Sequence, residues 1–584
     1  MNEKPESIWR RPWKGPKATL AWFGLLAVAV ALVVLVIVLL SDSKNVAAGD
    51  PLIWTVIIAV GLSLMGFLGF LFIRWLCCWP NFKRFLFVAA CLVTLVAMAY
   101  AVENWRGKRA WENYKRDQEA KGEVLDIMSL APPPVPDEQN FFATPSWQGM
   151  FRIRRNGSVV WNDPDFHKKW FLTVEAPNSE MSKTGDWIRG EPTALSEWQA
   201  YFRGPKNVFE SDHGKTNFFP IAFQPQTPAA DVLMALSRFD EQRAELREGA
   251  RRPHARFPIL YENGYGALLP HLSRMKAANR YFALSASAKL GLNHSEAALE
   301  DVLLGFRLVE AVRSEPILIS HLVRMAQLQI LLQPVWEGMA NRQWSDPQLA
   351  QIEETLSKMN FLSDYQFAIR GERAFMNSAV DYLKKGRLKA FREISDWTFS
   401  DRPFGAVLAQ VCPAGWFDQN KLNCARLYGD LYLPAADVES HRAFPEISAQ
   451  ATEKLESILR HRTPYDYMTG ILFPALERSV QRFAFAQASV DLARVACALE
   501  RFRLAKGSYP ESLDALAPQF LKQVPHDLIN GQPLKYRRTD DGRFILYSVG
   551  WNKTDDGGET GMTTNGNSRD PSRGDWVWRY TSED

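Results

Sequence analysis

The residues best suited to do chemistry are a histidine and its charged neighbours in an otherwise apolar segment. His321 lies close to Glu315 and Arg324 in a stretch that is apolar on most sides. Its best potential partners lie in a later helical segment and are Arg370, Glu372 and Arg373. Charged groups between helices can line a pocket, or they can form buried ion pairs that fix the register of the helices. We expect the structural role, because such networks are common in folded proteins, and we assign no catalytic residue.

Familiar catalytic and nucleotide-binding motifs are absent from the sequence. It contains no His-Glu-x-x-His, no Gly-x-Ser-x-Gly and no close Cys-x-x-Cys pair. The Gly214-Lys215-Thr216 triplet lacks the earlier glycine that a phosphate-binding loop requires. A net charge of +4 on 584 residues does not predict nucleic-acid binding. We expect a non-enzymatic interaction protein, and the alternative is an exported, membrane-anchored enzyme with a pocket in its helical domain.

Three uncharged apolar runs dominate the N-terminal part, and the rest of the chain follows the third run. They cover residues 18–40, 52–73 and 85–102. About 20 apolar residues in a helix cross a hydrocarbon core of roughly 30 Å. The sequence therefore predicts a three-span membrane block over residues 18–102. The first run is longer than the apolar part of a signal peptide and no clear cleavage site follows it, so we expect it to be retained.

The flanking charges predict how this block is oriented. Lys4, Arg10, Arg11, Lys14 and Lys17 precede the first run in the tail 1–17. The first loop has a single lysine and the second has Arg74, Lys83 and Arg84 without an acid. Because basic residues gather on the cytoplasmic side, we expect a multi-pass protein of the bacterial inner membrane with its N-terminus in the cytoplasm. The large C-terminal part is then extracytoplasmic, although several basic residues follow the third run.

The chain after the membrane block divides by composition into four segments. Residues 103–136 predict a helix that continues the third span to Met128, and then a Pro-rich linker at 131–136. Residues 137–265 are irregular, with a hairpin predicted around Asn156-Gly157 and a strand at 170–174. Residues 266–470 predict a helical domain, and residues 471–584 a long helix followed by a small α+β unit. Within residues 267–386 we expect five helices, broken near Gly291, Pro316, Ser345 and Asn360.

The exported cysteines leave two possibilities open. Cys412, Cys424 and Cys497 follow the membrane block, and an odd number cannot pair fully within one chain. Cys412 and Cys424 can close a small loop in an oxidising compartment. The alternative is that they are buried free thiols.

The C-terminal unit carries the most specific pattern in the chain. A helical stretch ends in Gly507-Ser508-Tyr509-Pro510 and is followed by a short helix at 510–517. Val524-Pro525-His526-Asp527 and a turn at Gly531 come next. Two strands, 534–538 and 543–548, are joined by Asp540-Asp541-Gly542, which is typical of a hairpin turn.

This order of elements resembles the C-terminal half of the major pseudopilins of type II secretion. The resemblance covers roughly the last hundred residues. It implies a small α+β unit and partners among envelope or secretion proteins, in addition to the lipid bilayer. The processing site and single apolar helix of that family are absent here, and Asp527 is followed by Leu528 instead of proline. The rest of the chain is similar to large membrane-anchored bacterial proteins, which implies no mechanism.

The resemblance also implies a calcium site, because a loop after the sheet can hold calcium in that family. The matching residues here are Asp555, Asp556, Glu559 and Asp575. Ca²⁺ takes six or more oxygen ligands, and closely spaced acids with glycines can supply them. The alternative is a solvated surface loop. The fold class that we expect is thus a three-span α-helical anchor, a mainly α exported domain and a small α+β pseudopilin-like unit.

Overall fold

The computed structural model describes most of the chain from residue 79 onward and a few residues between 61 and 76. The described ranges are 79–148, 151–154, 159–161, 185–204, 208–211, 214–217, 219–398, 410–461, 463–467, 478–563 and 569–580. Contacts divide the chain into two compact units, Met1–Trp105 and Arg106–Asp584. The first apolar run, most of the second run and the strand expected at 170–174 lie outside the described residues. The division falls at the end of the third run and not at the Pro-rich stretch.

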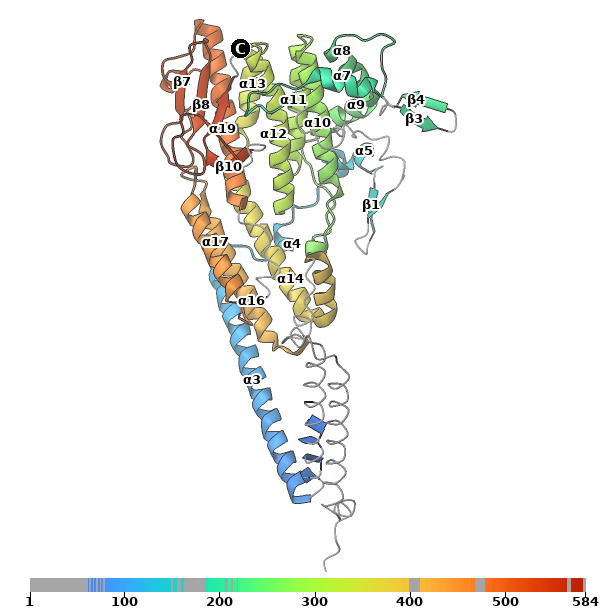
Figure 1. The fold of residues 1–584 in the computed structure, drawn as a ribbon, viewed down its shortest axis with the longest axis vertical. Coiled ribbons are helices and arrows are strands. Elements are labelled where there is room, and N and C mark those ends of the chain that lie inside the picture. Colours follow the sequence, from blue (N-terminus) through green and yellow to red (C-terminus); the bar gives the residue numbers. More distant parts are fainter. Residues whose placement is uncertain are drawn as a thin grey trace, which may run out of the picture. The chain divides into compact units, whose positions relative to one another are not determined.

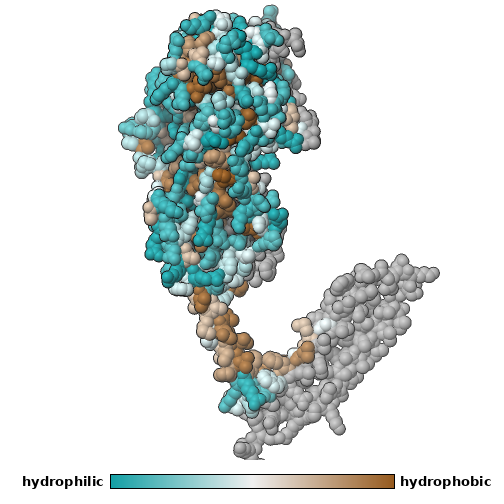
Figure 2. Space-filling model, turned by 90° about the vertical axis from the view of Figure 1, so that its left-hand side faces the viewer, coloured by the Kyte–Doolittle hydropathy of each residue, from teal (hydrophilic) through white to brown (hydrophobic). Residues whose placement is uncertain are grey.

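The longest helix, α3 (Trp79–Ala120), contains the third apolar run. Its first half exposes large apolar side chains, with Phe87 71% and Val93 68% exposed, and Figure 2 shows this stretch in brown. It is long and apolar enough to cross a membrane, and no other helix among the described residues passes that test. The structure thus supports one of the three predicted spans. The predicted extension to Met128 is wrong: the chain turns at Gly122, which has a φ of 80° that favours glycine.

Five helices follow in the order predicted between residues 267 and 386, and this prediction is confirmed (Figure 1). They are α10 (Pro270–Leu290), α11 (Ser295–Ala311), α12 (Leu318–Ala340), α13 (Asp346–Ser357) and α14 (Phe361–Thr398). Ser345 caps α13 by a capping box with Gln348, which explains the break there. α12 packs against α10 and α11, and α13 packs against the later helix α19 (Ser479–Lys506). These helices form the centre of the hydrophobic core.

Shorter elements surround these helices. The hairpin predicted around Asn156-Gly157 is confirmed, because β1 (Phe151–Ile153) pairs antiparallel with β2 (Val159–Trp161). Two further small antiparallel pairs are β3 (Val208–Ser211) with β4 (Gly214–Asn217) and β5 (Ala436–Asp437) with β6 (Arg442–Ala443). Among the described residues, the other α-helices are α4 (Ile127–Leu130), α5 (Pro145–Gln148), α7 (Leu195–Arg203), α8 (Pro228–Leu236), α9 (Asp240–Gly249), α16 (Ala414–Arg426) and α17 (Pro445–Arg460). A π-helix, η8 (Leu427–Tyr432), continues α16. The 3₁₀ turns before α19 are η2 (Asp137–Gln139), η3 (Phe141–Ala143), η6 (Ser237–Phe239), η7 (Tyr261–Gly266) and η9 (Leu433–Ala435).

The C-terminal unit contains the predicted hairpin and one strand that the sequence did not reveal. β7 (Lys535–Arg538) and β8 (Phe544–Ser548) pair antiparallel, as expected. β11 (Trp576–Arg579) adds a third strand, giving the order β11-β8-β7. A second small sheet pairs β9 (Thr560–Met562) with β10 (Arg569–Gly574). The short helix expected at 510–517 is only a 3₁₀ turn, η11 (Leu513–Leu516).

This unit shares its core with the helices. The carboxylate of Glu500 on α19 is buried and accepts hydrogen bonds from the hydroxyls of Tyr509 (2.6 Å) and Tyr580 (3.0 Å). The indole nitrogen of Trp336 on α12 donates to the carbonyl oxygen of Arg579 at 2.8 Å. The rings of Trp187 and Trp578 lie 5.1 Å apart. The sheet is therefore packed onto the helical region.

The structure also decides between the two possibilities for the cysteines. The side chains of Cys412, Cys424 and Cys497 are buried thiols. A disulfide between Cys412 and Cys424 is not formed, and these residues contribute to the core as small apolar side chains.

Candidate functional site

His321 lies in the core, where its surroundings suit a structural role. The side chain is fully buried, and its Nε2 donates to the carbonyl oxygen of Glu315 at 2.9 Å. Burial and the positive charge of Arg324 lower the pKa of His321 to about 3. The ring is therefore neutral near pH 7, where a general base would have to exchange protons.

The neighbours of His321 form buried ion pairs, but their partners are not the ones that the sequence predicts. The guanidinium of Arg324 is fully buried between the carboxylates of Glu310 and Asp364, and it also donates to the carbonyl oxygen of Val309 at 3.1 Å. The carboxylate of Glu315 bonds to the Nε2 of His271 at 2.8 Å and to the hydroxyl of Ser320. These contacts join α10, α11, α12 and α14. Removing one member would leave a buried charge without a partner, which is costly.

Arg370 and Arg373 have a different partner from the one expected. Both guanidinium groups bind the carboxylate of Glu123, which lies between α3 and α4, and Arg370 does so at 2.8 to 3.1 Å. Burial acts to raise the pKa of Glu123, but hydrogen bonds from the two arginines outweigh it, so that the pKa is lowered. The pair fastens the segment after α3 to α14. Nothing in the sequence signals this contact, because the partners are about 250 residues apart.

Glu372 does not bind Glu123 or the two arginines, and its carboxylate lies at the start of α12. Its carboxylate accepts hydrogen bonds from the backbone nitrogen of Leu318 at 3.1 Å and from the hydroxyl of Tyr265 at 3.4 Å. Burial raises the pKa of Glu372 to about 7. This carboxyl can therefore hold a proton near neutral pH. Its bonds to the start of α12 and to a tyrosine indicate a structural role.

The four acids of the expected calcium loop each bind donors of the protein. The Asp575 carboxylate accepts hydrogen bonds from the backbone nitrogens of Asp556 (3.1 Å) and Gly558 (2.7 Å). Lys535 and the Tyr547 hydroxyl bind Asp555, both at 3.0 Å. Asp556 accepts from Asn552 at 2.8 Å, and Glu559 pairs with Arg579 at 3.6 Å. In the described part of the chain, no group of three or more His, Cys, Asp or Glu residues is placed to hold a metal ion. A calcium site at this loop stays a prediction.

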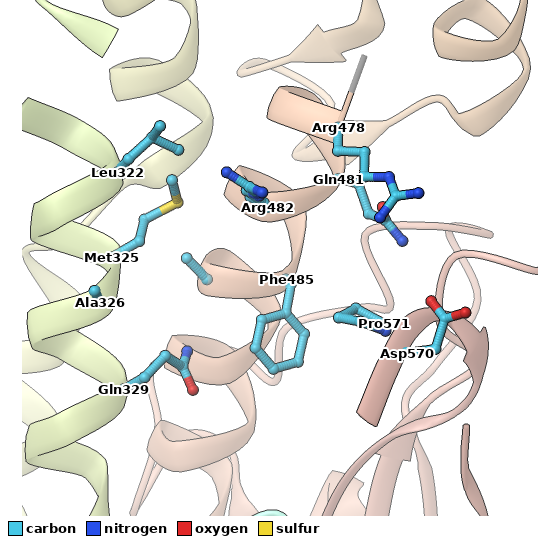
Figure 3. A pocket seen from close by; sticks show the side chains of 11 residues that line it. Leu322, Met325, Ala326, Gln329, Arg478, Gln481, Arg482, Phe485, Asp570 and Pro571 are labelled. Atoms are coloured by element: carbon cyan, nitrogen blue, oxygen red, sulfur yellow. The ribbon is translucent and has the colours of Figure 1, made fainter. Parts of the chain in front are cut away.

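A cavity of about 390 Å³ lies between α12, α19 and β10 (Figure 3). Its apolar lining includes Leu322, Met325, Phe485 and Pro571, and its polar lining includes Gln329, Arg478, Gln481, Arg482 and Asp570. The volume falls in the range of small-molecule sites, which are mostly apolar with a few polar groups. No pattern in the sequence signals this cavity, because its three lining segments are separated along the chain by about 85 residues or more.

No protein-family model, curated protein or solved structure matches the chain.

Proposed function

We propose that this chain is a multi-pass protein of the bacterial inner membrane whose large C-terminal part is extracytoplasmic and binds other envelope or secretion proteins without catalysing a reaction. The observation that carries the proposal is helix α3. Its first half presents apolar side chains that are more than half exposed, such as Leu92, Val93 and Leu95. A helix with such a surface is stable in lipid, where its backbone hydrogen bonds are satisfied internally.

The positions of the basic residues support the proposed orientation. Lysine and arginine are concentrated in the N-terminal tail and the second loop, which supports a cytoplasmic position for both. The basic residues after the third run argue against this orientation, but several of them have contacts of their own. Arg106 lies over the ring of Tyr465 at 5.1 Å, and Lys115 pairs with Glu119 at 3.7 Å. Long translocated segments depend little on their charge.

The local arrangement of the C-terminal unit supports a pseudopilin-like fold. Tyr509, in the Gly-Ser-Tyr-Pro turn, is held by Glu500 of the preceding helix. The buried carboxylate of Asp527 accepts hydrogen bonds from the backbone nitrogens of Ile529 and Val549 and from the hydroxyl of Ser548. It thereby joins the loop after the helix to the end of β8. A non-catalytic role is further supported by His321, whose burial and low pKa remove the best candidate for acid–base chemistry.

Topology is the experiment that tests this proposal first. Single-cysteine variants Asp541→Cys and Lys83→Cys, each made after the native cysteines are replaced, place one thiol in the β7–β8 hairpin turn and one just before the third run. Both positions are exposed. With a membrane-impermeant maleimide on spheroplasts, we expect Asp541→Cys to react at once and Lys83→Cys to react only after lysis.

Each variant is the control for the other. Labelling of Asp541→Cys shows that the reagent works on intact spheroplasts, and protection of Lys83→Cys shows that it does not leak across the membrane. If Asp541→Cys reacts only after lysis, the C-terminal part is cytoplasmic and an envelope role is excluded. If both variants react in intact spheroplasts, the expected position of the second loop is wrong.

A further inference from the structure

The cavity between α12, α19 and β10 has a positively charged end. α19 begins at Ser479, and the first turn of a helix has unpaired backbone N–H groups and a partial positive charge. Arg478 and Arg482 lie at this end of the cavity (Figure 3). Both arginine side chains are exposed. This end of the cavity therefore suits an anion.

Gln481 adds an amide group without a hydrogen-bond partner among the described residues to this end of the cavity. Its side chain lines the cavity and is only 7% exposed. Its Nε2 has no hydrogen-bond partner within the part of the chain that the structure describes. A buried amide donor without a partner costs free energy, and a turn of the Gln481 side chain toward the cavity would let an oxygen of a bound ligand satisfy it.

The single acid in the lining does not neutralise the arginines. Asp570 accepts a hydrogen bond from the backbone nitrogen of Ser572 at 3.0 Å and another from the hydroxyl of Ser572. It also pairs with Arg573 at 3.5 Å. Those contacts and the nearby positive charges lower the pKa of Asp570, so that it is ionised and already bound. Two arginines against one occupied carboxylate leave the cavity with a positive charge.

The remainder of the lining is apolar. Leu322 and Met325 on α12 face Phe485 on α19 across the cavity, with Pro571 beside Phe485 (Figure 3). Gln329 donates from its Nε2 to the hydroxyl of Ser489 at 3.0 Å, which holds it at the far end. A ligand that fills this space needs an apolar body of modest size as well as an anionic head.

We propose that this cavity binds a small carboxylate with an apolar tail, of the alkanoate class. The carboxylate lies against Arg478, Gln481 and Arg482, where a planar guanidinium can donate two parallel hydrogen bonds. The tail extends between Met325 and Phe485. Every residue that lines the site belongs to the unit Arg106–Asp584.

The test is a titration of the full-length protein with octanoate in nanodiscs of zwitterionic phosphatidylcholine, followed by calorimetry. We expect saturable binding to the wild type and binding that is weaker by about tenfold or more in the double variant Arg478→Gln/Arg482→Gln, because charge-assisted hydrogen bonds are lost. The matched control Lys506→Gln removes an exposed positive charge at the other end of α19 and should bind as the wild type does. Partition of octanoate into the bilayer is the same in every sample and cancels.

Two further measurements test separately the roles of the carboxylate and of the apolar chain of the ligand. Octanol has the same chain without the charge, and we expect no saturable binding. Ala326→Phe fills the cavity without changing its charge, and it should abolish binding of octanoate at an unchanged unfolding temperature. Equal octanoate affinity in the wild type and the double arginine variant would overturn the proposal. Octanol binding as tightly as octanoate would do the same. If Ala326→Phe does not fold, the arginine and octanol comparisons still decide the question.

Discussion

Glu372 shows how burial at a single residue gives the protein a dependence on pH. Its pKa lies at about 7 in the folded protein against an ordinary value of 4.5. Between these values the folded state holds a proton that the unfolded state has released. The contribution of Glu372 to stability is therefore complete below about pH 4.5 and is lost as the pH rises through about 7.

We expect Glu372→Gln to remove much of this dependence. Because each unit of pKa difference corresponds to about 1.4 kcal/mol, the free energy of unfolding of the wild type should fall by a few kcal/mol over this range on account of Glu372. Denaturation of the full-length protein at several pH values, followed by tryptophan fluorescence, measures this slope. The exposed Glu354 supplies the control, since Glu354→Gln should keep the wild-type slope. If the free energy of unfolding changes equally with pH in the wild type and in Glu372→Gln, then Glu372 does not titrate in this range.

At the scale of elements, the second half of α3 packs onto α16 through a pair of glycines. A Cβ atom on Gly107 would lie 2.2 Å from the carbonyl oxygen of Gly415, which is backbone and cannot turn aside. Gly107→Ala should gain about 1 kcal/mol in helix propensity, but it forces the two helices apart at a cost of about 1–3 kcal/mol. We expect a net loss of stability and faster hydrogen exchange in α16 (Ala414–Arg426).

Lys108→Ala is the matched control, because Lys108 is exposed on the same turn of α3. It should change the free energy of unfolding by less than about 0.5 kcal/mol. An unfolding midpoint for Gly107→Ala equal to that of the wild type would mean that α3 and α16 are not closely packed in solution.

The elements that the sequence revealed are those with local signals. The five helices from α10 to α14 follow apolar periodicity and end at prolines, glycines or caps, which act within a few residues. The hairpin of β7 and β8 follows from its Asp-Gly turn. β11 gave no such signal, because its apolar Trp576-Val577-Trp578 run is too short to identify without its partner β8. The end of α3 comes earlier than the sequence predicts, because nothing near Gly122 signals that this glycine adopts a left-handed conformation.

Contacts between segments that are far apart in the chain cannot be predicted from the sequence, and the reason is physical. Glu123 binds two arginines on α14, and the cavity is lined by three elements that meet only after folding. The pattern within each segment shows which face is apolar and not which other segment covers it. The sequence suggests Arg370 and Arg373 as partners for the residues around His321, whereas in the fold both bind Glu123.

At the scale of the whole molecule, the C-terminal unit is continuous with the helical region rather than appended to it. The ring of Trp576 lies 5.4 Å from that of Phe485 on α19, and Trp336 on α12 stacks with Tyr580 at 6.3 Å. Arg543 donates to the carbonyl oxygen of Ala340 at the end of α12, at 2.6 Å. One hydrophobic core includes side chains from α10 through to β11.

A chain that ends at Lys506 should therefore lose more than the C-terminal sheet. The truncation exposes the apolar faces of α12 and α19 and leaves Glu500 and the Trp336 indole without their buried partners, so we expect the helical region to unfold at a lower temperature and to be cleaved faster by protease. A chain that ends at Tyr580 is the control and should behave as the full-length protein does. An unchanged unfolding temperature for the chain ending at Lys506 would show that the unit folds separately, as an independent pseudopilin-like module would. The shared core argues for one cooperative transition, in which a partner bound at the sheet stabilises the helices as well.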